Sequence, residues 1–133
     1  MLQEEEVLEL SRRLLADGYT VLLETSGERN LTRVPKEVIK VMDVKCPGSG
    51  EGGRFCVDNL AVLSPRDEVK FVLAGREDYD FAVRFLNEHP IPGAVHFSPV
   101  FGKLDPKELA AWVLEDGINV RINLQVHKLL ELK

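Results

Sequence analysis

The side chains best suited to chemistry gather in five short stretches, each directly after an apolar run of strand length. These stretches are Glu24 to Gly27, Asp43 to Gly50, Ala74 to Arg76, Ser98 to Gly102 and Gln125 to Lys128. Ligands of α/β proteins bind beyond the carboxyl ends of the strands, which is where these stretches fall. Loops of any protein are polar, so the clustering by itself also fits ordinary solvent-exposed turns.

Polar and apolar side chains alternate along residues 119–127. The polar row consists of Arg121, Asn123, Gln125 and His127. On an edge strand such a row faces water, whereas inside a barrel it lines a cavity and donates to carboxylate or heterocycle oxygens. Arg121 is the natural carboxylate partner because its planar guanidinium donates two hydrogen bonds at once. Asp43 and Lys45 share a strand face in the same way, and a plain ion pair is the alternative interpretation.

Two patterns that resemble familiar sites do not meet their requirements. The glycine-rich loop from Cys46 to Gly53 matches neither the Walker nor the dinucleotide spacing, although Ser49 and the loop amides can approach a ligand carboxylate. Cys46 and Cys56 are the only cysteines, so the chain cannot supply three thiolates to an iron–sulfur cluster. The histidines stand on separate elements without an evident carboxylate partner, and we interpret them as surface or packing residues, with His127 the best exception. They are His89, His96 and His127.

Strand-like and helix-like segments alternate along the chain, which predicts the α/β class with mainly parallel strands. The expected strands are Tyr19 to Glu24, Val38 to Lys45, Val69 to Leu73, Ala94 to Ser98 and Asn119 to His127. A first helix from Glu4 to Asp17 ends at Gly18 and carries Val7, Leu10, Leu14 and Leu15 on one side. Further helical segments are expected over Asp58 to Leu63, over Asp78 to Glu88, and from the cap at Asp105-Pro106 to Gly117.

Length and composition indicate one soluble domain over residues 1–133. The chain has 133 residues, 44% of them hydrophobic, and a formal net charge of −5, which excludes a generally basic nucleic-acid binder. It contains neither a run long enough to span a membrane nor a secretory signal, so we expect a cytoplasmic protein. Five strands are few for either a barrel or a doubly wound sheet, and a helix precedes the first of them. We therefore expect that N-terminal strands of the sheet are missing.

The strand-end stretches, taken in order, resemble those of the 7-carboxy-7-deazaguanine synthases. Glu24-Thr25-Ser26-Gly27 and Asp43-Val44-Lys45-Cys46-Pro47-Gly48-Ser49-Gly50 are similar to the family's Glu-Thr-Asn-Gly and Asp-Val-Lys-x-Pro-x-Ser-Gly segments. Residues 67–73, 97–102 and 120–128 resemble the family in the same order. Ser26 replaces the usual asparagine, an exchange that a turn tolerates.

The resemblance implies a radical S-adenosylmethionine lyase of queuosine and 7-deazapurine biosynthesis. Such enzymes convert 6-carboxytetrahydropterin to 7-carboxy-7-deazaguanine with loss of ammonia. They bind a [4Fe–4S] cluster through three cysteines near the N-terminus and use a magnesium ion. Their fold is an incomplete (β/α) barrel, usually in a homodimer.

The resemblance also assigns residues to ligands. The positions implied for S-adenosylmethionine are Gly27, Lys45, Ser49, Gly50, Ser98, Pro99, Val100 and Phe101. Those implied near the pterin substrate are Thr25, Arg121, Gln125 and His127.

The family's cluster motif, its Gly-Gly-Glu-Pro segment and its magnesium-binding hydroxyl would all lie before Met1. We therefore expect the C-terminal portion of such an enzyme, without cluster or magnesium, without a catalytic residue of its own, and inactive by itself. One alternative is a non-catalytic α/β module that binds a partner or a second copy. Another is one chain of a split enzyme. No nucleic-acid or membrane partner is expected, whereas a homo-oligomer is.

Overall fold

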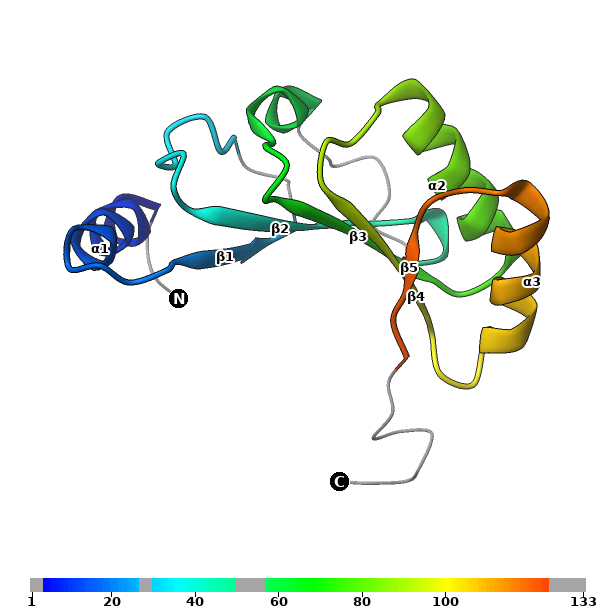
Figure 1. Ribbon diagram of the computed structural model, residues 1–133. Coiled ribbons are helices and arrows are strands. Elements are labelled where there is room, and N and C mark those ends of the chain that lie inside the picture. The colour runs from blue at the N-terminus through cyan, green and yellow to red at the C-terminus, as the bar shows by residue number, and fades with distance from the viewer. Residues whose placement is uncertain (1–3, 27–29, 50–56, 125–133) are drawn as a thin grey trace.

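Five parallel strands form an open sheet in which spatial order follows chain order. A computed structural model of the chain describes residues 4–26, 30–49 and 57–124 (Figure 1). The strands are β1 (Leu22–Thr25), β2 (Ile39–Val44), β3 (Glu68–Leu73), β4 (Ala94–Pro99) and β5 (Arg121–Ile122), in the order β1-β2-β3-β4-β5. The predicted α/β class with parallel strands is confirmed, and the open sheet is compatible with a partial barrel.

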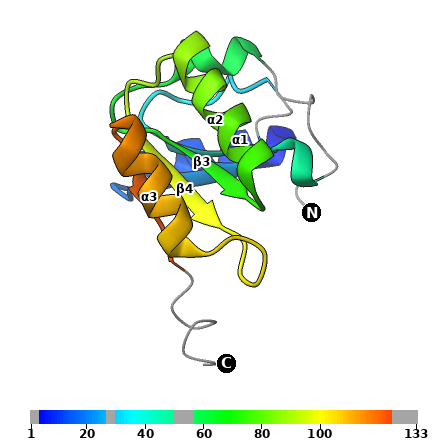
Figure 2. The same ribbon diagram turned by 90° about the vertical axis from the view of Figure 1, so that its right-hand side faces the viewer.

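Two helices connect strands and cover one face of the sheet, namely α2 (Arg76–Glu88) and α3 (Pro106–Asp116). Helix α1 (Glu4–Ala16) precedes β1, and the short 3-10 helices η1 (Pro47–Ser49) and η2 (Val57–Val62) lie between β2 and β3. α2 and α3 lie side by side over β3 and β4 (Figure 2). Crossovers between parallel neighbours are right-handed, so α2 and α3 return on the same side, and neither of them covers the opposite face.

The helix-covered face holds an aromatic core. Phe71 of β3 packs edge-on against Phe97 of β4 and Phe85 of α2, with ring centroids 5.6 and 5.5 Å apart. Tyr79 of α2 contacts both Phe97 and Trp112 of α3. Burial of each large apolar side chain stabilises the fold by about 1.5–3 kcal/mol, so these contacts hold α2 and α3 to the sheet.

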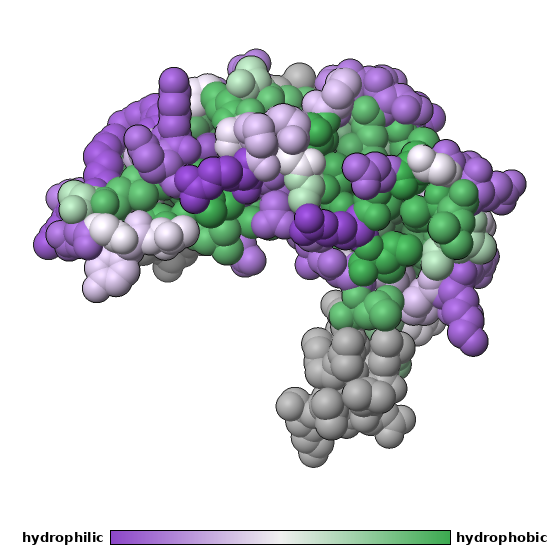
Figure 3. Space-filling model, viewed as in Figure 1, coloured by the Kyte–Doolittle hydropathy of each residue, from purple (hydrophilic) through white to green (hydrophobic). Residues whose placement is uncertain are grey.

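The other, open face of the sheet is half-exposed and of mixed polarity, because apolar and charged residues share it. Buried and half-exposed side chains alternate strictly along β2 and β3. Pairing Asp43 with Lys70, and Lys70 with His96, places these three side chains on the half-exposed face. The described chain forms an arch with a hollowed lower side, and strongly hydrophilic side chains gather along its middle (Figure 3).

The element ends follow their predicted signals in most places. The Asp105 side chain accepts a hydrogen bond from the Lys107 N–H at 2.9 Å, and α3 ends at Gly117 with φ +64°. Gly18, with φ +89°, follows α1 in the same left-handed conformation. The last strand is shorter than predicted within the described residues, because β5 comprises only two residues. The loop after β2 begins with a 3-10 turn that the sequence did not indicate.

Two helix faces differ in detail from the sequence pattern. In α1 the buried side chains are Leu8 and Ser11, whereas Leu10 is 47% exposed. Ser11 is buried because its hydroxyl donates to the Val7 carbonyl at 2.8 Å. In α2 the buried residues are Asp78, Tyr79 and Ala82, so a charged residue lies on the buried side of this helix.

A buried ion pair joins the amino ends of β2 and β3. The Asp67 carboxylate lies 3.5 Å from the Lys40 ammonium and accepts hydrogen bonds from the Lys40 and Ser64 backbone N–H groups at 2.8 Å. Both side chains are almost fully buried. Removing one partner would therefore leave an uncompensated charge in the core.

We predict that Asp67→Ala lowers the free energy of unfolding by about 3–5 kcal/mol, as expected when one half of a buried ion pair is lost. Urea denaturation measures this change. Asp80→Ala is the matched control, because Asp80 is exposed and pairs with Arg76 within one helix face. That control is expected to change stability by less than about 0.5 kcal/mol. Equal effects of the two substitutions would contradict the prediction.

Candidate functional site

A polar cavity lies at the carboxyl ends of β1 and β2 on the open face. It has a volume of about 280 Å³ and is lined by Glu24, Thr25, Ser26, Val41, Asp43, Lys45 and Lys70. It brings together Thr25 and Lys45, which the resemblance had assigned to substrate and cofactor respectively. Asp43 and Lys70 join them because β2 and β3 pair in register at that level.

Asp43 and Lys45 form an ion pair with an unused acceptor. The Lys45 ammonium lies 3.3 Å from Asp43 Oδ2, and both side chains remain about one-third exposed. Asp43 Oδ1 is buried, and it has no hydrogen-bond partner within the described part of the chain. The ion pair anticipated as the alternative interpretation is present. The buried Oδ1 remains available to a ligand N–H or O–H donor.

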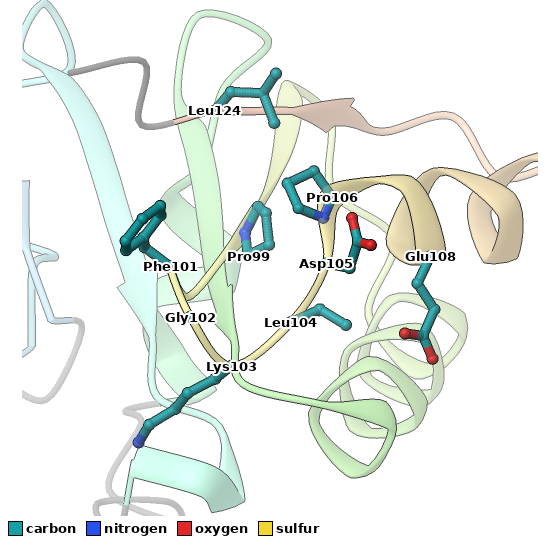
Figure 4. A pocket seen from close by; sticks show the side chains of 9 residues that line it. All are labelled: Pro99, Phe101, Gly102, Lys103, Leu104, Asp105, Pro106, Glu108 and Leu124. Atoms are coloured by element: carbon teal, nitrogen blue, oxygen red, sulfur yellow. The ribbon is translucent and has the colours of Figure 1, made fainter. Parts of the chain in front are cut away.

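A larger cavity of about 420 Å³ lies at the carboxyl end of β4 (Figure 4). Its lining residues are Pro99, Phe101, Gly102, Lys103, Leu104, Asp105, Pro106, Glu108 and Leu124. Phe101 and Leu124 are about half exposed, and Phe101 therefore presents a free aromatic ring. Such a ring beside prolines and two carboxylates suits a flat, nitrogen-rich heterocycle.

The backbone fixes the start of this second cavity. Ser98 is almost fully buried, and the Val100 N–H donates to the Leu73 carbonyl at 2.8 Å. The turn after β4 is thus tied to the end of β3. The four residues implied for cofactor binding from Ser98 to Phe101 therefore span the end of β4, and this hydrogen bond fixes where the chain leaves the sheet.

A polar chain crosses the middle of the open face. The His96 ring contacts the Glu68 carboxylate through Nε2, and Nδ1 lies 3.2 Å from Asn123 Oδ1. Arg121 is paired in register with His96 and lies on the same face. The sequence analysis missed the carboxylate beside His96 because Glu68 lies 28 residues away in sequence. The only signal in the sequence was the alternation that places Arg121 on the polar side of its strand, the side on which His96 also lies.

Comparison with known proteins gives a consistent result. A 7-carboxy-7-deazaguanine synthase of Koribacter versatilis is 48% identical over 145 aligned residues, which include 98% of this chain and 64% of the relative. A synthase of Methanospirillum hungatei is 35% identical over 99% of this chain and 55% of the relative. A third, from Chlorobaculum tepidum, is 42% identical over 81% of this chain.

The chain is homologous to the 7-carboxy-7-deazaguanine synthases. The homology runs over nearly its whole length, so the family resemblance of the strand-end stretches is confirmed. The chain spans between about half and two-thirds of the length of these synthases. No family model matches the chain. No solved structure matches it either.

The described residues of this synthase homologue include eight of the twelve predicted site positions. Gly27, Gly50, Gln125 and His127 lie outside the described residues. Ser49 ends η1. Thr25 and Lys45 share the first cavity, and Pro99 and Phe101 share the second. The roles assigned to all twelve stay predictions.

The described residues do not fit the metals that the family resemblance implies. No group of three His, Cys, Asp or Glu side chains able to hold a metal ion occurs within the described ranges. The whole chain contains two cysteines, one fewer than the cluster requires. No helix within the described ranges is long and apolar enough to cross a membrane.

Cys46 is unsuited to thiolate chemistry. Burial, with the Asp78 and Asp43 carboxylates nearby, raises the pKa of this thiol to about 12. Its Sγ lies against the Val44 carbonyl. A neutral, buried thiol packs as a small apolar group and neither attacks nor ligates.

We predict that Cys46 resists alkylation by iodoacetamide at pH 8 in the folded chain, since the thiolate fraction at a pKa near 12 is only on the order of 10⁻⁴. Labelling followed by tryptic mass mapping reports it alone, because the peptide CPGSGEGGR contains Cys46 and the next peptide contains Cys56. Urea should expose the thiol to rapid labelling. Because the folded pKa lies above the usual 9.0, stability should fall as pH rises from 9 towards 12. Equal labelling rates with and without urea would contradict the prediction.

Proposed function

We propose that this chain supplies the C-terminal walls of a 7-carboxy-7-deazaguanine synthase. Those walls would bind S-adenosylmethionine and 6-carboxytetrahydropterin. The observation that carries the proposal is the 48% identity to the Koribacter versatilis synthase over 98% of this chain. Two strand-end cavities, on the elements where the family resemblance assigns ligand residues, support it.

The cavity residues suit the functional groups of S-adenosylmethionine. That cofactor carries a carboxylate, an ammonium, hydroxyl groups and a flat adenine. The Lys45 ammonium suits an anionic group, and the buried Asp43 Oδ1 suits a cationic or hydroxyl donor. The exposed Phe101 ring suits the adenine face. When bound and reduced, S-adenosylmethionine supplies the radical that starts the rearrangement.

The open face suits a carboxylated pterin. His96 lies between two cationic residues on this face, because it is paired in register with Lys70 of β3 on one side and with Arg121 of β5 on the other. A guanidinium and an ammonium on one concave surface match the substrate carboxylate. Glu68 and Asn123 engage both ring nitrogens of His96 and thereby fix the orientation of its ring on this face.

The 133 residues by themselves are proposed to be inactive. Reductive cleavage of the sulfonium requires an electron from the cluster, and the two thiols of this chain cannot hold a cluster that needs three. The chain would therefore act together with a polypeptide segment that carries three cluster cysteines. The three cysteines would serve equally well on a longer form of the same chain or on a separate subunit.

We predict no 7-carboxy-7-deazaguanine when the 133-residue chain is incubated anaerobically with iron, sulfide, a reductant, S-adenosylmethionine and 6-carboxytetrahydropterin. A chimaera in which this chain replaces the matched region of the Koribacter versatilis synthase should form the product. The unmodified relative is the positive control, and liquid chromatography with mass spectrometry measures the product.

The two arms of this experiment test different statements. Product from the 133-residue chain alone would refute the proposed inactivity. A chimaera that folds and binds its cluster but forms no product would refute the assignment of function.

We also propose that a second copy of this chain covers its exposed edge. Within the described ranges β1 pairs only with β2, so one side of it has no strand partner. Three large apolar residues near that edge are about half exposed or more, namely Leu10, Tyr19 and Leu22. An unpaired strand with apolar neighbours favours association.

We predict a dimer or larger oligomer for the chain at micromolar concentration, measured by light scattering after size-exclusion chromatography. Leu22→Lys should shift the population towards monomer, because Leu22 is 54% exposed and a charge there disfavours strand pairing without disturbing the core. A monodisperse monomer of the unsubstituted chain would count against the proposal.

A further inference from the structure

Two loops of the proposed cofactor site meet at one buried carboxylate. The loop after β2 begins with η1, and the turn after β3 leads into α2. Asp78, in the first turn of α2, is only 2% exposed. Its Oδ1 accepts a hydrogen bond from the Gly48 N–H at 2.7 Å, and its Oδ2 accepts one from the Ala74 N–H at 2.8 Å.

The two hydrogen bonds have different functions. Ala74 directly precedes the N-cap of α2, so its bond to Asp78 belongs to the capping of that helix. Gly48 belongs to another segment, 30 residues away in sequence. Its bond is therefore not needed for the helix. It ties the β2 loop to the end of β3.

Burying this carboxylate requires both donors. A buried charge is costly unless hydrogen bonds of good geometry offset the lost hydration. Within the described ranges no Lys or Arg pairs with Asp78, so the two backbone amides are the donors on which it depends. Any displacement of the loop from α2 would leave the carboxylate short of one hydrogen bond.

Gly48 has no space for a side chain. A Cβ built on this residue would lie 2.5 Å from Asp78 Oδ2 and 2.9 Å from Oδ1. The backbone thus approaches the carboxylate as closely as only glycine allows. The contact fixes both the distance and the direction of the loop.

We propose that Asp78 is a positioning residue that holds the β2 loop, with Lys45 at its start and Ser49 at the end of η1, in the geometry that binds S-adenosylmethionine. The inference rests on the proposed function, because the resemblance assigns both residues to that cofactor. Asp78 itself does not touch the ligand. It acts through the Gly48 amide.

The test compares Asp78→Asn with Asp80→Asn in the 133-residue chain by nitrogen-15 NMR. An asparagine amide accepts through one oxygen only, so one of the two N–H groups loses its acceptor. Amide exchange should accelerate about tenfold in Asp78→Asn at Gly48 or at Ala74, whichever loses its acceptor, as expected for the loss of a hydrogen bond to a charged group. The dissociation constant for added S-adenosylmethionine should rise by a similar factor. Asp80→Asn, on the exposed side of the same helix, should change neither quantity.

Gly48→Ala is a second variant, which keeps the Asp78 carboxylate and changes the loop side of the contact. Its methyl group pushes the loop away from Asp78, so the affinity for S-adenosylmethionine should fall in this variant too, even if Asp78→Asn does not fold. Unchanged exchange at both Gly48 and Ala74 in folded Asp78→Asn would overturn the proposal. Unchanged affinity in both variants would also overturn it. If neither the unsubstituted chain nor the chimaera described above binds S-adenosylmethionine, the cofactor assignment itself fails, and this proposal fails with it.

Discussion

The parallel pairing of every strand with the next strand along the chain determines most of this structure. Each crossover returns on the same side, so α2 and α3 occupy one face and the other stays open. Apolar residues of β2, β3 and β4 are buried beneath the helices, and the alternate residues face outward. The same constraint that builds the core therefore also builds a concave polar surface.

Parallel pairing also places all the strand ends on one edge. The loops after β2, β3 and β4 meet there although long stretches of sequence separate them. The Val100 N–H ties the β4 turn to the end of β3, and Asp78 ties the β2 loop to the same point. The loops after β2 and β4 are therefore both held at the end of β3.

Signals confined to neighbouring residues could be interpreted from the sequence. The structure reproduces three such local signals: the helix cap at Asp105, the helix end at Gly117, and the alternation that places Arg121 and Ile122 on opposite faces of β5. Asp78 and the Glu68–His96 contact depend on strand register and on how a helix packs, which no local pattern encodes. The family resemblance supplied the ligand positions, but it named no residue that positions them.

The charges of the open face balance one another. Glu24, Asp43 and Glu68 carry three negative charges, and Lys45, Lys70 and Arg121 carry three positive charges on the same side of the sheet. Such a surface has little net attraction for a simple ion of either sign. It suits ligands that carry both signs within one molecule, where each group meets an opposite charge at a fixed place. S-adenosylmethionine is such a ligand, since an ammonium and a sulfonium accompany its carboxylate. The mixed charge of this face is thus compatible with that cofactor, as it is with other ligands that carry both charges.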